Sequence, residues 1–280
     1  MKAGAPLAML ALLAGSLAGP AQAQTMLDQE QRLIELHSLL LVLPALDPPG
    51  ALAPLQARFG VEVVGVPLID GTTGAKTQLT ASDRTRIIPR LRAGLGIPLP
   101  GAWRAFAGIG WIPPVEINRA SSSMFGLEAG LSWSHGPFST GLRLHGEAAD
   151  SKSPVTDPAT RDRLVSKVGG GELQAGWRFE LGPVGLTPYA GVGVARVDGA
   201  FTVTSDGYVL TSRTTDLALS AGVRVLAMAQ LEAVAQLVAW PGRLVHPSFA
   251  LAWSPRFGKA EPAPQERQTG PAELSGSAPQ

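Results

Sequence analysis

The sequence lacks cysteine entirely, although it runs to 280 residues. A chain without cysteine has no disulfide framework and no thiolate metal ligands, and it carries no lipidated cysteine behind a signal sequence. The sequence therefore has to be stabilised by a core, by strand pairing or by ion pairs.

Charge of one sign is also lacking. Lys and Arg number 23 and Asp and Glu number 22, for a formal net charge of +1. Nucleic-acid binding depends on an excess of positive charge on the protein, so we expect no nucleic-acid partner. The four histidines are too scattered for a multi-histidine metal site: His37, His135, His145 and His246. The Gly-x-Gly steps at 94–96 and 191–193 are followed by no crossover helix, so they predict no dinucleotide site. We expect no metal and no cofactor.

Long apolar runs are missing after the first residues. Leu7 to Leu17 is apolar, follows Lys2, and precedes the small-residue pattern Ala21-Gln22-Ala23. This is typical of a cleaved signal peptide, predicted over 1–23. The apolar run is short of the roughly 20 residues of a membrane-spanning helix, which leaves an uncleaved anchor as the weaker alternative. No later run is long enough, so any later crossing of a membrane has to be made by strands.

What the sequence does contain is alternation with a period of two. From Ser123 to Glu147, large apolar residues alternate with small or polar ones on both sides of a His135-Gly136-Pro137 turn. Successive side chains of a strand point to opposite faces. This segment therefore predicts a β-hairpin with one apolar face and one polar, charged face.

The same pattern recurs along most of the chain. Further strands are predicted over 58–64, 90–97, 103–111, 172–180, 186–194, 216–225, 231–240 and 248–254. The 231–240 segment is ambiguous, because Glu232 and Gln236 share the parity of Val234 and Val238. Polar stretches at 70–83 and 150–167 are predicted to be loops. The pattern indicates about ten strands, with eight as the alternative.

Two features favour a closed antiparallel transmembrane β-barrel over a soluble β-sandwich or barrel. Tight turns alternate with longer polar loops, as between the two rims of an outer-membrane barrel. Large aromatic residues lie near strand ends, where membrane-interface girdles are found: Trp103, Trp111, Trp133, Phe138, Trp177, Trp240 and Trp253. An even strand number places both ends of the barrel on the periplasmic side.

Segments of different composition flank the predicted barrel at 58–257. Residues 24–57 contain leucines at helical spacing before Pro44, followed by an Asp47-Pro48-Pro49-Gly50 linker. We expect a short periplasmic helix here, either packed against the barrel rim or docked on a partner or on the membrane. Residues 258–280 are rich in Pro, Ala, Gln, Glu and Ser, and predict a disordered periplasmic tail.

The last strand carries a family resemblance. Phe249, Leu251, Trp253 and Phe257 share one parity, and a terminal aromatic residue on the closing strand resembles the insertion signal of small bacterial outer-membrane barrels. The chain is similar by this pattern to the OmpA-like transmembrane barrel. The chain departs from the OmpA-like pattern in two places: Pro255 interrupts the alternation, and a tail follows Phe257. The resemblance implies residence in the outer membrane of a Gram-negative bacterium, with membrane lipid as a partner.

The polar face of such a barrel points into the lumen. Its predicted charged residues balance in sign: Glu62, Arg90, Arg92, Arg104, Glu128, Arg143, His145, Glu147, Glu172, Arg178, Glu180, Asp216 and Arg224. A narrow barrel leaves little room for water, and opposite charges on neighbouring strands are the least costly filling. We expect a structural ion-pair network, with a narrow polar pore as the alternative.

Catalysis is the weakest of the functional alternatives. His145, Glu147 and Ser139 share the polar face, but residues two apart on a strand are about 7 Å apart, too far for a proton relay. We therefore expect a non-enzymatic barrel with no catalytic residues, which serves as a structural component of a cell-envelope assembly such as secretion, export or surface motility. Protein partners would bind the helix or the tail. The alternatives are a narrow porin-like channel and a soluble binding protein.

Overall fold

The structure is a computed structural model, and it describes residues 26–66, 85–117, 120–157, 160–205, 207–227 and 230–257. The predicted signal peptide, the 70–83 loop and the C-terminal tail lie outside these residues. The strands are β1 (Ala57–Gly65), β2 (Ile87–Pro98), β3 (Trp103–Ile117), β4 (Ala120–His135), β5 (Phe138–Asp157), β6 (Thr160–Trp177), β7 (Phe179–Leu181), β8 (Val184–Thr202), β9 (Val209–Ala227), β10 (Leu231–Trp240) and β11 (Leu244–Trp253).

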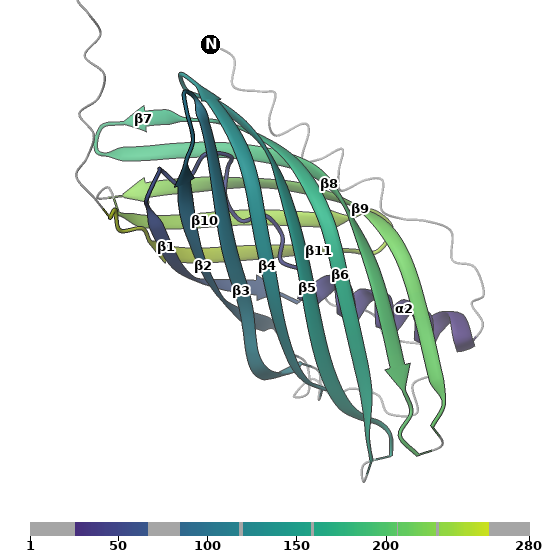
Figure 1. The fold of residues 1–280 in the computed structure, drawn as a ribbon. Helices are drawn as coiled ribbons and strands as arrows, with labels where there is room; N and C mark the ends of the chain where they lie inside the picture. The colour runs from purple at the N-terminus through teal and green to yellow at the C-terminus, as the bar shows by residue number, and fades with distance from the viewer. Residues whose placement is uncertain are drawn as a thin grey trace, which may run out of the picture.

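The strands form one closed antiparallel barrel (Figure 1). Consecutive strands pair with each other except β6 and β7, which both pair with β8, and β1 pairs with β11 to close the wall. The three-residue β7 continues the line of β6 beyond Arg178, so the wall is ten strands around over the described residues. The predicted fold class is therefore confirmed. Closure leaves no unpaired sheet edge, which is a requirement for strands that cross a lipid bilayer.

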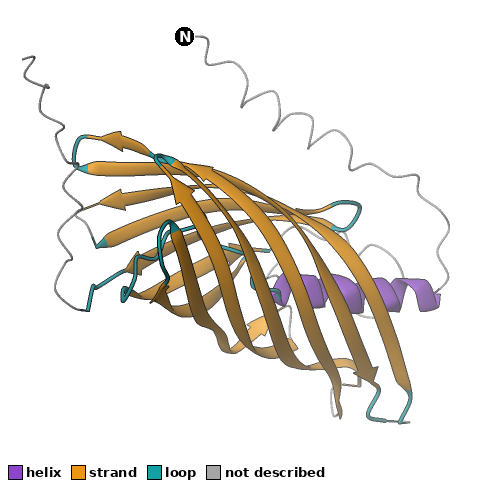
Figure 2. Ribbon diagram, turned by 45° about the horizontal axis from the view of Figure 1, so that its top comes forward, coloured by secondary structure: helices purple, strands orange, loops and turns teal. Residues whose placement is uncertain are grey.

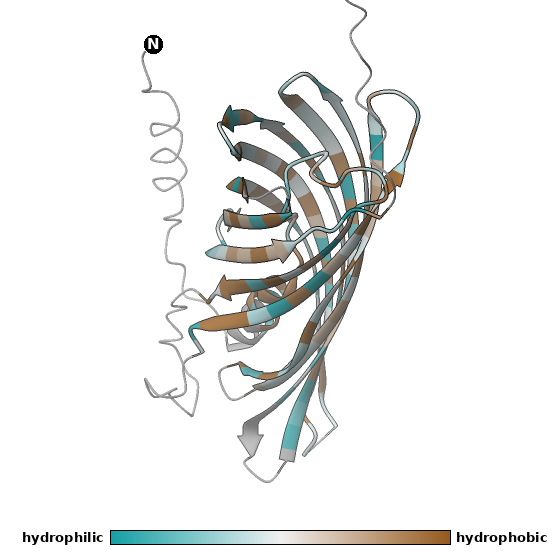
Figure 3. Cartoon of the chain, turned by 90° about the vertical axis from the view of Figure 1, so that its left-hand side faces the viewer, coloured by the Kyte–Doolittle hydropathy of each residue, from teal (hydrophilic) through white to brown (hydrophobic). Residues whose placement is uncertain are grey.

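Figure 3 shows hydrophilic and hydrophobic residues interspersed along the strands, and the alternating burial of these residues assigns them to opposite faces of the wall. Leu127, Leu144 and Leu173 point outward and stay 57 %, 57 % and 58 % exposed, whereas Glu62 and Arg90 point inward and are fully buried. A belt of exposed leucine, valine and aromatic side chains around a buried charged interior inverts the pattern of a soluble protein. It is the arrangement of a barrel surrounded by hydrocarbon.

The wall is much taller on one side than on the other. Strands β1, β10 and β11 have 9 or 10 residues, whereas β5, β6, β8 and β9 have 18 to 20. The prediction of a loop over 150–167 was wrong, because β5 and β6 pair through most of it, as far as Asp157 and Thr160. Turn-forming residue types do not prevent pairing when both neighbouring strands supply an unbroken backbone ladder.

A β-bulge in β3 changes which residues face the lumen. The register with β4 shifts between Ile112 and Val115, around Pro113-Pro114. Ile112 and Ile117 are consequently both buried although their numbers differ in parity. A bulge inserts one unpaired residue and so exchanges the two faces of the strand.

One helix, α2 (Met26–Leu41), lies on the concave side of the long strands (Figures 1 and 2). It contacts β6, β8 and β9. Helical spacing of Leu33, Leu36 and Leu40 favours the helix, and Pro44 prevents its continuation because proline has no amide hydrogen to donate. No helix among the described residues is both long enough and apolar enough to span a membrane.

Candidate functional site: the filled lumen

One part of the site is the mouth of the barrel at the end that contains its two longest connections, β1 to β2 and β8 to β9. We call this the long-loop end and the opposite one the short-turn end. Side chains from several strands hold α2 in this mouth. Glu35 accepts a hydrogen bond from Ser212 Oγ at 2.8 Å and pairs with Arg243 Nη1 at 2.6 Å. His37 Nε2 lies 2.9 Å from Ser151 Oγ and 3.3 Å from Ser122 Oγ. These partners come from β9, the β10–β11 turn, β5 and β4, so the helix lies within the mouth and not beside it.

Below the mouth, the leucines of the helix and Leu43, just beyond its end, are packed into an apolar stretch of lumen. Leu39 and Leu43 are fully buried, and Leu36, Leu40 and Leu41 are nearly so. They form one cluster with side chains from the surrounding strands: Val64, Ile88, Ile112, Ile117, Met124, Ala149, Val168, Ala195, Val197, Val238, Trp240 and Leu244. Barrel interiors are ordinarily polar. Here the inner wall is apolar where it surrounds the helix, and burial of a leucine side chain contributes about 1.5–3 kcal/mol.

The C-terminal end of α2 meets a group of lumen arginines. The last turn of the helix contains no basic residue, and its terminal carbonyl oxygens carry partial negative charge. Arg90 donates to the carbonyl oxygen of Leu40, Arg143 Nη2 donates to that of Leu43 at 2.8 Å, and Arg92 Nη2 donates to that of Pro44 at 2.6 Å. The barrel wall thus supplies a cationic partner to one terminal carbonyl of the helix, that of Leu40, and to the carbonyls of Leu43 and Pro44 just after it.

Residues 42–56 then run through the remaining lumen to the short-turn end. The backbone N–H groups of Leu43 and Ala45 donate to Glu147 and Glu172, at 3.3 Å each, and Tyr189 donates to the carbonyl oxygen of Leu46 at 2.7 Å. Further along, Arg104 Nη1 donates to the carbonyl oxygen of Gly50 at 3.1 Å. We call residues 34–56 the plug. Its path places the start of α2 and the start of β1 at opposite ends of the barrel.

The arginines that hold the plug are themselves paired with carboxylates. Glu62 lies 2.9 Å from Arg92 Nε and 3.5 Å from Arg90 Nη1. Glu128 lies 2.7 Å from Arg143 Nε and 3.6 Å from Arg92 Nη1. Burying a charge costs several kcal/mol unless it is paired and hydrogen-bonded. Because each guanidinium holds a carboxylate with one edge and a plug carbonyl with another, the network needs both the wall and the plug.

A second ion-pair cluster surrounds Glu232, which is buried on β10. Glu232 pairs with Arg224 Nη2 at 2.8 Å and accepts a hydrogen bond from Ser254 Oγ at 2.6 Å, while Arg58 Nε lies 3.5 Å away. Arg58 also pairs with Asp47 of the plug. The sequence prediction omitted Arg58, Glu232 and Asp47. The parity that Glu232 shares with Val234 and Val238 was the available signal, since all three face the lumen.

Most of the charged residues predicted for the lumen lie within it, and Arg178 and Glu180 lie at its open end. They pair with each other at 2.6 Å, and their side chains are 53 % and 61 % exposed. Arg178 Nε and Glu180 Oε2 each lie 3.8 Å from the position of a Cβ added at the buried Gly185 of β8, so both side chains keep the inward face but lie outside the buried network. Arg104 is only partly buried, and its contact is with the plug backbone. Asp216 lies near the mouth and pairs with Arg243 at 3.2 Å.

The sequence argument placed His145 and Glu147 too far apart for a hydrogen bond, and the structure contradicts it. Their side chains lean together, so that Nδ1 of His145 lies 2.7 Å from Oε1 of Glu147. The argument used the spacing of residues along the strand and did not allow for the length of the two side chains. Glu147 also accepts from the plug backbone at Leu43, so the pair forms part of the contact between wall and plug.

Six of the seven predicted interface aromatics lie on or near the outer surface. Trp103, Trp111, Trp177 and Trp253 are 45–52 % exposed, and Phe138 lies between Trp133 and Trp177, with ring centroids 6.5 Å and 6.3 Å apart. Their contact with lipid headgroups stays a prediction. Trp240 was wrongly assigned: it is 2 % exposed and packs inside the barrel with Leu244. The even residues of β10 face inward, which the ambiguous pattern left undecided.

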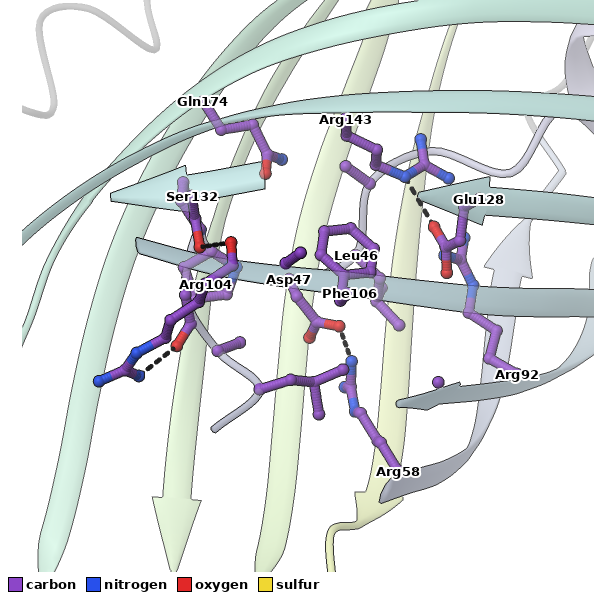
Figure 4. A pocket seen from close by; sticks show the side chains of 18 of the residues that line it. Leu46, Asp47, Arg58, Arg92, Arg104, Phe106, Glu128, Ser132, Arg143 and Gln174 are labelled. Atoms are coloured by element: carbon purple, nitrogen blue, oxygen red, sulfur yellow. Dashed lines mark hydrogen bonds and ion pairs between the residues drawn. The ribbon is translucent and has the colours of Figure 1, made fainter. Parts of the chain in front are cut away.

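A cavity of about 50 Å³ lies between the plug and the wall near the short-turn end (Figure 4). Residues 45–52 of the plug form one side. The charged residues that line it are Arg58, Arg92, Arg104, Arg143, Asp47 and Glu128. Four cations therefore face two carboxylates across this cavity.

Comparison with known proteins gave structural likenesses only. No protein-family model matches the chain, and no curated protein matches it. The translocator domain of autotransporter NalP from Neisseria meningitidis is 13 % identical, with 82 % of this chain and 95 % of that chain covered and a TM-score of 0.45. The N-terminal β-barrel domain of Pseudomonas aeruginosa OprF is 13 % identical, with 72 % of this chain and 98 % of that chain covered and a TM-score of 0.31. LpxR from Salmonella typhimurium is 11 % identical, with 71 % of this chain and 100 % of that chain covered and a TM-score of 0.37.

These similarities are too low to transfer a role to the chain. The fold rests instead on the chain's own strand pairing, on its outward apolar belt and on its buried charged lumen. By these features the chain has the architecture of a bacterial outer-membrane β-barrel, closed on itself around ten strands and filled by its own N-terminal segment.

Proposed function

We propose that the protein is a non-enzymatic outer-membrane barrel that is kept closed by its own plug and serves as a structural component of a cell-envelope assembly. The observation that carries this proposal is the plug itself. Leucines fill the apolar half of the lumen, and backbone groups from Leu40 to Ala51 bond to lumen side chains. In an open porin the lumen arginines would face water, whereas here their N–H groups donate to backbone carbonyl oxygens of the plug.

The geometry of the plug supports an assembly role through its two ends. The plug is a lumen-crossing segment added to an even number of strands, so α2 begins at the mouth opposite the one where β11 ends. A barrel of this kind has the start of α2 and the end of β11 at different rims. One partner on each side of the membrane could then bind the same barrel, which suits secretion, export or motility assemblies.

A narrow channel is the second candidate, and the charged lower lumen favours it. If the plug left the lumen, the side chains of Arg92, Arg143, Glu128 and Glu172 would line a polar passage. The proposal and this alternative predict different conductances.

We expect the purified wild-type protein to be electrically silent in planar lipid bilayers. Discrete conductance steps from the wild-type protein would contradict the closed barrel and favour the channel. Insertion is verified in the same preparation by heat-modifiable mobility on gels, because a barrel that never inserted would also be silent.

A further inference from the structure

The cavity between plug and wall has a positively charged lining that the ion pairs around it do not neutralise. Its volume is about 50 Å³, whereas one water molecule needs roughly 10–15 Å³. Its charged lining consists of four arginines and two carboxylates, a local excess of two positive charges. A group larger than one water and negative in charge would fit it.

Buried polar atoms beside this cavity have no hydrogen-bond partner. Nε and Nη2 of Arg58 and Nη1 of Arg143 are buried donors without an acceptor, on side chains that are 8 % and 5 % exposed. Arg58 Nε is 3.5 Å from Glu232 and Arg143 Nη1 is 4.0 Å from Glu172, neither with hydrogen-bond geometry. Leaving a buried donor unpaired is unfavourable, and more so when the donor is charged.

A buried acceptor also lacks a partner at the same cavity. Asp47 binds Arg58 through Oδ2, while its Oδ1 is buried and unsatisfied. Figure 4 shows Asp47 and Arg58 on one side of the cavity, with Glu128 and Arg143 across from them. A ligand that completes the site has to accept from guanidinium groups and also donate one hydrogen to a carboxylate.

Hydrogen phosphate meets both requirements. Its charged oxygens accept hydrogen bonds from arginine, which binds phosphate well because of its fork of N–H donors. At neutral pH, inorganic phosphate is a mixture of H2PO4⁻ and HPO4²⁻, because its second pKa is close to neutrality, and both forms retain at least one P–O–H. Sulfate has the same shape but no hydrogen to donate, so it would leave Oδ1 of Asp47 facing another negative oxygen.

We propose that this cavity binds inorganic phosphate, held by Arg58 and Arg143 of the wall and by Asp47 of the plug. The proposal deepens the closed-barrel function and rests on it, because the plug forms one side of the cavity. A phosphate ion here bridges plug and wall. Since it binds only the plugged state, it stabilises that state by mass action.

The test is calorimetric titration of the full-length protein in detergent with sodium phosphate, and separately with sodium sulfate at equal ionic strength. We expect at least tenfold tighter binding of phosphate than of sulfate at pH 7. The Asp47→Asn variant keeps the shape of the side chain and supplies an amide donor, so we expect its preference to move toward sulfate by tenfold or more. Arg58→Gln should abolish saturable binding of both ions.

Arg163→Gln serves as the matched control, because Arg163 pairs with Asp150 on the exposed outer wall and should leave phosphate binding unchanged. Heat-modifiable mobility of each variant shows that the barrel has folded. If Arg58→Gln fails to fold, the Asp47→Asn result still decides. Absence of saturable phosphate binding in the wild type, or equal affinity for both ions in wild type and Asp47→Asn, overturns the proposal and leaves a water-filled cavity. Neither result bears on bilayer silence, so the closed-barrel function is tested separately.

Discussion

Replacing Leu39 and Leu43 together by glutamate should convert the silent barrel into a conducting one. Both side chains are fully buried in the apolar part of the lumen. An unpaired buried carboxylate costs several kcal/mol, and the contribution of about 1.5–3 kcal/mol from each of the two leucines is lost as well. The wall itself keeps its strand pairing, so we expect a folded barrel with an expelled plug and discrete current steps in planar bilayers.

The matched control for this variant is the double substitution Leu39→Met and Leu43→Met. Leucine and methionine have similar volumes, and such swaps usually cost under about 1.5 kcal/mol. We expect this variant to remain silent. If the glutamate variant is folded by heat-modifiable mobility and is also silent, leucine packing is not what closes the lumen.

Removing the carboxylate of Glu62 should produce the largest loss of stability among single substitutions in the network. Glu62 is fully buried and balances both Arg90 and Arg92. Glu62→Ala leaves two buried guanidinium groups without their shared carboxylate, and breaking a buried pair in this way costs about 3–5 kcal/mol. We expect a corresponding drop in the free energy of unfolding, measured by urea titration in liposomes.

Glu180→Ala is the matched control on the same barrel. Glu180 also pairs with an arginine, but its side chain is 61 % exposed at the open end of the barrel. Exposed ion pairs contribute about 0–1 kcal/mol. Equal effects of the two substitutions would mean that the lumen pairs are solvated, as they would be in an open pore, and not buried against a plug.

The fold followed from the sequence because its signal is local and repeated. Alternation such as that of Leu127, Leu131 and Leu142 with glycine, serine and arginine assigns each strand its two faces without any long-range information. That the apolar residues face outward could be inferred from the aromatic positions, whereas the loop lengths misled at 150–167, where β5 and β6 pair. Alternation failed where the backbone departed from regular pleating, at the bulge near Pro113.

The plug could not be predicted in the same way. A leucine-rich helix before Pro44 indicates only that one face will be buried, and the sequence prediction placed it at the rim or on a partner. The structure places it in the lumen, because the apolar inward positions Ile88, Met124 and Val168 form a matching surface there. Those residues come from three different strands, so their common surface exists only once the barrel has closed. The backbone contacts of Arg92 and Arg143 leave no trace in residue type.

The central claim, that α2 lies inside the barrel, is tested most directly by cross-linking in a chain with no native cysteine. Ser38 Oγ lies 3.8 Å from the position of a Cβ added at Gly199 on β8, which is within the reach of a disulfide. Ile34 Cγ2, the end of a side chain of α2, lies 2.7 Å from the same position and has to shift to admit it. We predict that Ser38→Cys with Gly199→Cys forms a disulfide spontaneously in membranes, visible as a mobility shift that reductant reverses. The pair Ser38→Cys with Ala200→Cys, one residue along and on the outer face, should not. Absence of the link at 199, or equal linking at 199 and 200, would contradict a helix held within the lumen.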